Sequence, residues 1–164
     1  MITEMVDGAV FVSPSPGFGH VDAVLALAGR LRAVAPPWLR VLASPFPVRL
    51  GRGTELCPDL VVARYVDLVR DVLTAPPLLA VEVRSPGDGL PDLGARRLVY
   101  ARHRVPSFWV LDPETPALTA LELDDDGDYR VVADVAAEEV FAAVRPFPVG
   151  FSALDLVAGL QPPC

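Results

Sequence analysis

The sequence predicts an α/β or α+β fold in which helices pack on a β-sheet. The main observation is the order of the periodic segments, which is β-α-β-β-β-β-α-β-β-β along the chain. A second observation is size, because 164 residues are typical of one domain. A third is the hydrophobic content of 52%, which supplies a sizeable core. We therefore expect a single domain spanning residues 1–164.

Two segments have the periodicity of helices. Apolar side chains recur every three or four positions in residues 20–35, and Pro36 and Pro37 end this pattern. The second predicted helix covers residues 92–104, with Asp92 as the expected N-cap.

The predicted strands are short runs of aliphatic and β-branched residues bounded by Gly or Pro. They cover residues 9–13, 38–43, 46–50, 58–63, 78–83, 108–111, 118–123 and 129–135. The acidic turn at residues 124–128 joins the last two as a hairpin. Residues 65–73 are compatible with a loop or a short helix, and residues 85–91 with a loop. We expect an extended segment at 144–151 and a short helix after it.

The charge of the chain limits its partners and its chemistry. The net charge of −7 argues against charge-driven adhesion to nucleic acid, although a local basic groove remains compatible with it. All 14 basic residues are arginine. No lysine is therefore present to act in any site.

Composition also predicts where the protein resides and how it assembles. Cys57 and Cys164 do not make a disulfide framework, so we expect a reducing cytoplasm. No apolar stretch approaches the roughly 20 residues of a membrane span, and no signal peptide is expected. The mean hydropathy of +0.40 is high for a small chain, which favours a homodimer.

Two acidic residues stand in apolar runs that we predict to be buried strands, Asp59 in residues 58–63 and Glu82 in residues 78–83. A buried carboxylate is costly unless a partner compensates it. A divalent metal held by one carboxylate from each strand is one such partner. A structural ion pair with Arg84 or Arg96 is the alternative.

The most basic part of the chain follows Glu82. It begins with Arg84 and continues on the second predicted helix, where Arg96 and Tyr100 share a face. A metal together with arginine is suited to phosphodiester chemistry, because both stabilise developing negative charge. His20 is either a site residue or a helix-terminal, solvated one, and Glu4 is a further candidate carboxylate. Tyr100 is expected in the core.

The order and spacing of several motifs resemble the Uma-two family of restriction endonuclease-like proteins. The family has the PD-(D/E)XK nuclease fold, so the resemblance implies an α/β fold with a mixed β-sheet flanked by helices. The motifs that carry the resemblance are Glu4-Met5-Val6-Asp7-Gly8, Pro58-Asp59-Leu60-Val61-Val62, Val81-Glu82-Val83-Arg84-Ser85-Pro86, Asp92-Leu93-Gly94-Ala95-Arg96-Arg97 and Pro106-Ser107-Phe108-Trp109-Val110-Leu111-Asp112.

The resemblance implies that Asp59, Glu82 and the backbone carbonyl of Val83 bind Mg²⁺ or Mn²⁺. It also implies a lysine two residues after the glutamate or on the following helix, and Arg84 and Arg96 occupy those two positions. Arginine can hold a phosphate, but it stays protonated and cannot act as a general base.

Two functions follow as hypotheses. The first is a metal-dependent endonuclease that hydrolyses phosphodiester bonds in DNA, with Asp59, Glu82, Arg84, Arg96 and His20 as its site residues. The second is a weakened or inactive protein of the same fold that acts as a binding module, because arginine replaces the motif lysine. An unrelated metal hydrolase is less favoured, since the chain has no cluster rich in His or Cys.

Overall fold

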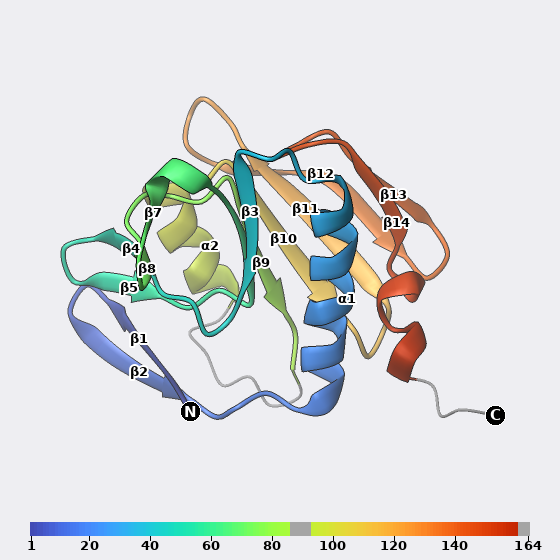
Figure 1. Cartoon of the computed structure of the whole chain (residues 1–164), viewed down its shortest axis with the longest axis horizontal. Helices are drawn as coiled ribbons and strands as arrows, with labels where there is room; N and C mark the ends of the chain where they lie inside the picture. The colour runs from blue at the N-terminus through green and yellow to red at the C-terminus, as the bar shows by residue number, and fades with distance from the viewer. Residues whose placement is uncertain (86–92, 161–164) are drawn as a thin grey trace.

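A large six-stranded sheet forms the centre of the computed structural model, which describes residues 1–85 and 93–160 (Figure 1). All its neighbouring strands are antiparallel except β9 and β10, which are parallel. The strands, in spatial order, are β12 (Tyr129–Ala136), β11 (Ala117–Leu123), β10 (Ser107–Asp112), β9 (Leu79–Val83), β6 (Leu60–Arg64) and β3 (Leu39–Ala43). The predicted mixed sheet with flanking helices is confirmed.

Helix α1 (Phe18–Val34) covers one face of this sheet. It begins two residues earlier than predicted and ends, as predicted, before Pro36 and Pro37. Its buried stripe of Ala23, Val24, Leu27 and Leu31 packs on inward-facing aliphatic residues of β3, β6 and β9. The helical spacing read from the sequence is thus the spacing that meets the core.

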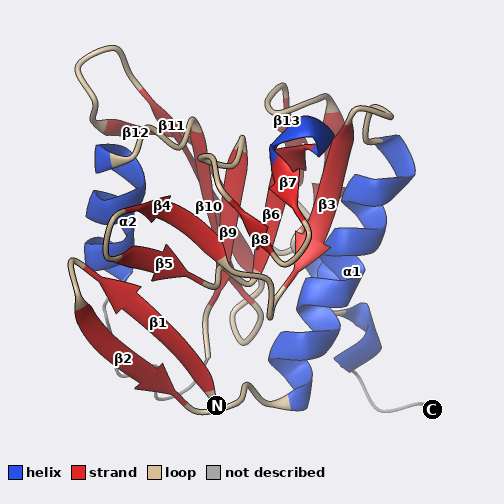
Figure 2. Ribbon diagram, turned by 60° about the vertical axis from the view of Figure 1, so that its left-hand side comes forward, coloured by secondary structure: helices blue, strands red, loops and turns tan. Residues whose placement is uncertain are grey.

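Helix α2 (Leu93–Arg102) covers the opposite face and links the parallel strands β9 and β10 (Figure 2). Its Val99 and Tyr100 pack with Ala80 of β9 and Phe108 of β10. The expected N-cap, Asp92, and the expected loop at 85–91 lie outside the described residues apart from Ser85. Because both faces of the sheet are covered, its central strands are almost entirely apolar, as in β9, where all five residues are buried and only Glu82 is polar.

A second sheet lies against the α2 side of the large one, where Val48 and Leu73 pack on Val61 and Ala63 of β6. Its strands, in spatial order, are β2 (Ala9–Ser13), β1 (Ile2–Val6), β5 (Thr54–Leu56), β4 (Val48–Gly51), β8 (Val72–Leu73) and β7 (Leu68–Val69). Residues 65–73, left open between loop and helix, form a short 3₁₀ turn, η1 (Tyr65–Asp67), and the β7–β8 hairpin. Strand β1 was not predicted.

The C-terminal part differs from the expected extended segment. It contains a separate antiparallel hairpin, β13 (Val140–Ala143) and β14 (Val149–Ser152), which adds Phe141 and Phe151 to the α1 side of the core. Two 3₁₀ turns, η2 (Leu154–Leu156) and η3 (Ala158–Leu160), replace the expected helix. The acidic hairpin turn at 124–128 is confirmed. None of the described helices is long and apolar enough to cross a membrane.

Candidate functional site

Asp59 and Glu82 come from neighbouring strands at the centre of the large sheet. Strands β6 and β9 are antiparallel, with Leu60 opposite Val81. Continued by one residue, this register places Asp59 opposite Glu82. The sequence predicted Asp59 inside a strand, but β6 begins one residue later. The carboxylate therefore stands at the end of β6, where its side chain can reach groups beyond the sheet.

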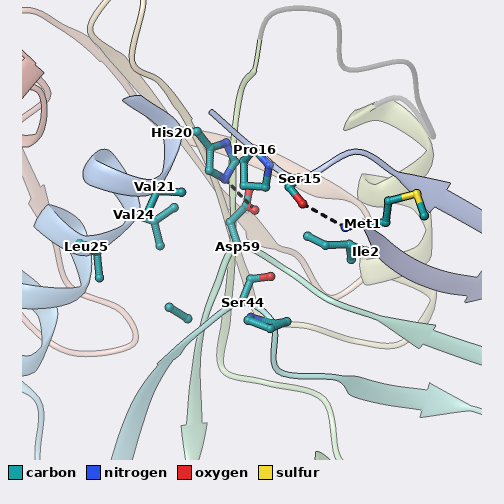
Figure 3. Close-up of a pocket in the computed structure, with 12 residues that line it drawn as sticks. Met1, Ile2, Ser15, Pro16, His20, Val21, Val24, Leu25, Ser44 and Asp59 are labelled. Atoms are coloured by element: carbon teal, nitrogen blue, oxygen red, sulfur yellow. Dashed lines mark hydrogen bonds and ion pairs between the residues drawn. The ribbon is translucent and has the colours of Figure 1, made fainter. Parts of the chain in front are cut away.

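Hydrogen bonds to both carboxylate oxygens hold Asp59 in place. His20, in the first turn of α1, has its Nε2 2.9 Å from Asp59 Oδ1 (Figure 3). The backbone N–H of Val83 donates to Oδ2 over 2.7 Å. The Ser85 Oγ lies 2.8 Å from the other ring nitrogen of His20, Nδ1. Because a carboxylate only accepts, Nε2 carries a proton, and in a neutral ring Nδ1 accepts from the Ser85 hydroxyl.

Glu82 belongs to a second, more deeply buried network. Arg96 Nη1 and the Tyr100 hydroxyl both donate to Glu82 Oε1, over 3.1 Å and 2.5 Å. Arg96 also grips Glu4 of β1 as a fork, with Nη1 to Oε1 at 3.0 Å and Nη2 to Oε2 at 2.5 Å. The side chains of Glu4, Glu82 and Arg96 are only 2%, 7% and 14% exposed. Arg96 is thus the shared counter-ion of two buried carboxylates.

The sequence explains why these side chains meet. Glu82 alternates along β9 with Val81 and Val83, which face the α1 core, so Glu82 faces α2. Arg96 and Tyr100 are four residues apart on α2 and therefore lie on the same side of that helix. The structure brings Arg96 to Glu82, as one reading of the sequence expected, and it confirms that Tyr100 is buried.

Electrostatics follow from this burial. Burial raises the pKa of Glu82 to about 8; Asp59 adds to the shift by repulsion, while Arg96 and the Tyr100 hydroxyl oppose it. The proton of the neutral form belongs on Oε2, since Oε1 accepts from Arg96 and Tyr100. Burial and the adjacent Glu82 also raise the pKa of Tyr100, which keeps its hydroxyl a donor. Burial alone would lower the pKa of Arg96, but Glu82, Tyr100 and Glu4 raise it, so Arg96 is a permanent cation.

Arg84, unlike Arg96, pairs with a different acidic residue, Asp112. Its guanidinium lies 3.7 Å from Asp112 at the end of β10 and is 59% exposed. The backbone N–H of Arg84 continues the sheet by donating to Leu111. Arg84 therefore presents a solvent-accessible cation near the end of β9, whereas Arg96 lies inside the network.

Two residues of these hydrogen-bond networks, Ser85 and Glu4, were not clearly indicated as site residues by the sequence. Ser85 was quoted only as part of a motif, and its bond to His20 depends on a contact across 65 residues. Glu4 was a candidate carboxylate, but the sequence predicted no strand that contains it.

A half-buried Cys57 lies nearby, and its backbone N–H donates to Glu4 Oε1 over 2.8 Å. Burial, reinforced by Glu4, raises the pKa of the Cys57 thiol to about 11, so the thiol is inert at neutral pH.

The charge count of the two networks bears on metal binding. Fully ionised, Asp59, Glu82 and Glu4 carry three negative charges against the single positive charge of Arg96. The excess of two equals the charge of one divalent cation. In the described residues, no group of three or more His, Cys, Asp or Glu side chains is arranged to hold a metal by itself. A metal here would therefore need backbone or solvent ligands besides the two central carboxylates.

The fold is similar to that of a protein whose crystal structure is known. It matches the crystal structure of a "putative nuclease belonging to DUF820" from Anabaena variabilis, with a TM-score of 0.80 and 16% sequence identity. The match covers 97% of this chain and 91% of that chain.

The family is established by sequence. The chain belongs to the Uma2 family, whose model is described as "Putative restriction endonuclease" and matches residues 2–157. No curated protein sequence matches the chain. The resemblance stated from the motifs is thus confirmed at the level of the family.

Proposed function

We propose that this protein is a metal-dependent endonuclease that hydrolyses phosphodiester bonds in DNA. The observation that carries the proposal is the convergence of Asp59 and Glu82 from adjacent strands; together with Glu4 they carry, when fully ionised, two more negative charges than Arg96 balances. The family description, restriction endonuclease, supports the same reaction class.

The residues at this place suit Mg²⁺ or Mn²⁺, because hard cations prefer oxygen ligands. We assign as ligands the carboxylates of Asp59 and Glu82 and the backbone carbonyl of Val83. Glu82 would use Oε2, since Oε1 accepts from Arg96 and Tyr100. When bound, the cation would polarise a phosphate oxygen and supply hydroxide at neutral pH.

The remaining residues have supporting roles in this proposal. Arg96 orients Glu82 and balances Glu4, and since it stays protonated it cannot abstract a proton. His20 orients Asp59 through Oδ1. Arg84, the exposed cation, would bind a phosphate of the DNA backbone, because guanidinium groups pair well with phosphate oxygens.

Calorimetric titration with Mn²⁺ tests the metal assignment. We expect wild type to bind one ion and Asp59→Ala to lose that binding. Asp125→Ala, which removes a carboxylate at the exposed hairpin tip, is the matched control and should bind as wild type does. Identical isotherms for wild type and Asp59→Ala would show that the assignment is wrong.

A second function, a non-catalytic binding module, is favoured by one observation. Arg96 is held on both sides by Glu4 and Glu82, at one of the two positions where the resemblance implies a lysine. If only the lysine is lacking, Arg96→Lys or Arg84→Lys should create or raise Mg²⁺-dependent cleavage of DNA. Arg102→Lys, on the exposed side of α2, is the control and should change nothing. Absence of cleavage by wild type and by both variants, with metal bound, would favour the binding module.

A further inference from the structure

A cavity of about 330 Å³ opens directly beside the His20–Asp59 pair (Figure 3). One wall is the start of α1, where Val21, Val24 and Leu25 line the space. The opposite wall comes from Ser44 and Pro45, which follow β3, and from the N-terminal end of β1. Its volume is within the roughly 300–1,000 Å³ of small-ligand sites.

The chemistry of the lining selects a neutral and largely apolar occupant. Apolar side chains form most of the wall, and the polar groups are contributed by Ser15, Ser44, His20, Asp59 and the terminal ammonium of Met1, which donates to Ser15 Oγ over 3.0 Å. Among the described residues, the charged groups that line the cavity are one carboxylate, that of Asp59, and one ammonium, that of Met1. These two charges offset each other and the rest of the wall is mostly apolar, so an uncharged ring with hydrogen-bonding edges is accommodated better than a fully charged group.

The position of Asp59 connects this cavity to the proposed reaction. The same carboxylate lines the cavity and stands opposite Glu82, where the scissile phosphate would bind. In a polynucleotide, an uncharged ring lies one sugar away from every phosphate. A ligand with its phosphate at the Asp59–Glu82 site would thus have a base within reach of the cavity.

We propose, on the basis of the proposed function, that this cavity is a subsite for one unstacked nucleobase next to the scissile phosphate. A base that is paired and stacked in a duplex cannot enter a pocket. The substrate class is therefore single-stranded DNA, or a duplex from which one nucleotide is extruded. Binding of the base would position the adjacent phosphate at Asp59 without a large basic surface, in agreement with the net charge of −7.

The test is titration with deoxyadenosine monophosphate in the absence of metal, followed by methyl NMR. We expect saturable shifts of the Val21, Val24 and Leu25 methyl resonances. Deoxyribose 5-phosphate, which lacks the base, should not shift them. Shifts with deoxyribose 5-phosphate alone, or methyl shifts confined to residues outside the cavity, would overturn the proposal.

Substitutions that fill the cavity provide the second readout. Val21→Trp should weaken nucleotide binding about tenfold or more, the loss expected for one base contact. Leu25→Trp should have the same effect and replaces Val21→Trp if that variant does not fold. Val34→Trp, on the same helix but outside the cavity, is the matched control and should bind as wild type does. Equal affinity of the filled and control variants would contradict a base in this cavity.

The nucleotide titration and the metal titration together distinguish a failure of the base subsite from a failure of the nuclease proposal. If Mn²⁺ binds wild type but not Asp59→Ala and no nucleotide shifts the cavity methyls, the subsite is wrong and the nuclease proposal stands. If the methyls shift and are blocked by Val21→Trp while no metal binds, the base site stands and the nuclease proposal fails.

Discussion

Arg96 determines the electrostatic state of the site, because it is the counter-ion of both Glu4 and Glu82. A lysine at this position would give a compact, rotatable cation, whereas the planar guanidinium makes a fixed fork on Glu4 and still reaches Glu82. Arg96 therefore cannot release a proton as a lysine could, but it holds two acids in place.

Removing this cation should destabilise the protein strongly. Arg96→Ala leaves Glu4 and Glu82 buried without a counter-ion, and we expect a loss of about 3–5 kcal/mol in the free energy of unfolding. Urea denaturation followed by circular dichroism measures it. Arg102→Ala, which breaks an exposed pair with Asp7, is the control and should have little effect. A loss as small as that of the control would mean that the two acids are not held by Arg96.

The raised pKa of Glu82 predicts how stability depends on pH. Its pKa is about 8 in the folded state and near the ordinary value of 4.5 in the unfolded chain. Between these pH values Glu82 is protonated in the folded protein and ionised in the unfolded chain. The contribution of Glu82 to the free energy of unfolding should therefore be most favourable below about pH 4.5 and should decrease until about pH 8. The slope should not exceed about 1.4 kcal/mol per pH unit.

Glu82→Gln isolates this contribution. Urea midpoints measured from pH 5 to pH 8 should fall with pH in wild type and should fall less in the variant, because Gln cannot titrate. Parallel curves for the two proteins would show that Glu82 is ionised over the whole range. Asp125→Ala, at the exposed hairpin tip, should retain the wild-type slope.

Much of the secondary structure could be predicted because the apolar patterns are strong. Helix α1 and the strands β9 to β12 match their expected ranges within two residues. Strand β1 was missed because Thr3 and Glu4 interrupt its apolar run, and Glu4 is buried only through Arg96, which lies 92 residues away. No pattern in the sequence around Glu4 indicates its pairing with Arg96.

The candidate site was predictable in part for the same reason. Asp59 and Glu82 stood out as acids in apolar runs, and their family motif placed them together. The Ser85–His20–Asp59 chain was not foreseen, because it depends on how the start of α1 meets the ends of β6 and β9. Arg84 and Arg96 were equal candidates, and only the packing of α2 distinguishes them.

The N-terminal hairpin of β1 and β2 positions Glu4, and its turn depends on glycine. Gly8 has a φ of +84°, a conformation that residues with a Cβ rarely adopt, and its N–H donates to the Gly53 carbonyl over 2.9 Å. Gly8→Ala should therefore destabilise the protein by about 1 kcal/mol.

A glycine-to-alanine substitution within α1 should instead increase the free energy of unfolding. Gly29 is exposed within α1, and a Cβ there would meet no atom within 4 Å. Gly29→Ala should stabilise the protein by about 0.5–1 kcal/mol, since alanine favours the helix. Thermal or urea denaturation of both variants checks the pair. Equal effects of the two changes would contradict the left-handed turn at Gly8.

The predicted homodimer remains a prediction for the assembled protein. Large apolar side chains are exposed on several elements, among them Phe18 on α1, Trp38 before β3 and Val140 on β13. Such exposure, together with the high mean hydropathy, favours an interface between two copies. Light scattering coupled to size-exclusion chromatography should give twice the mass of 17.5 kDa. A monomer at high concentration would remove this inference.

The fork between Glu4 and Arg96 also has a kinetic consequence. It joins the beginning of the chain to the second helix, so it closes a loop of more than half the sequence. Contacts of such long range form late, because their loop entropy must first be offset by other interactions. During synthesis on the ribosome, Glu4 emerges long before Arg96, so its carboxylate stays solvated until Arg96 is available. The acidic centre can therefore reach its final charge balance only after the central sheet and α2 have been made.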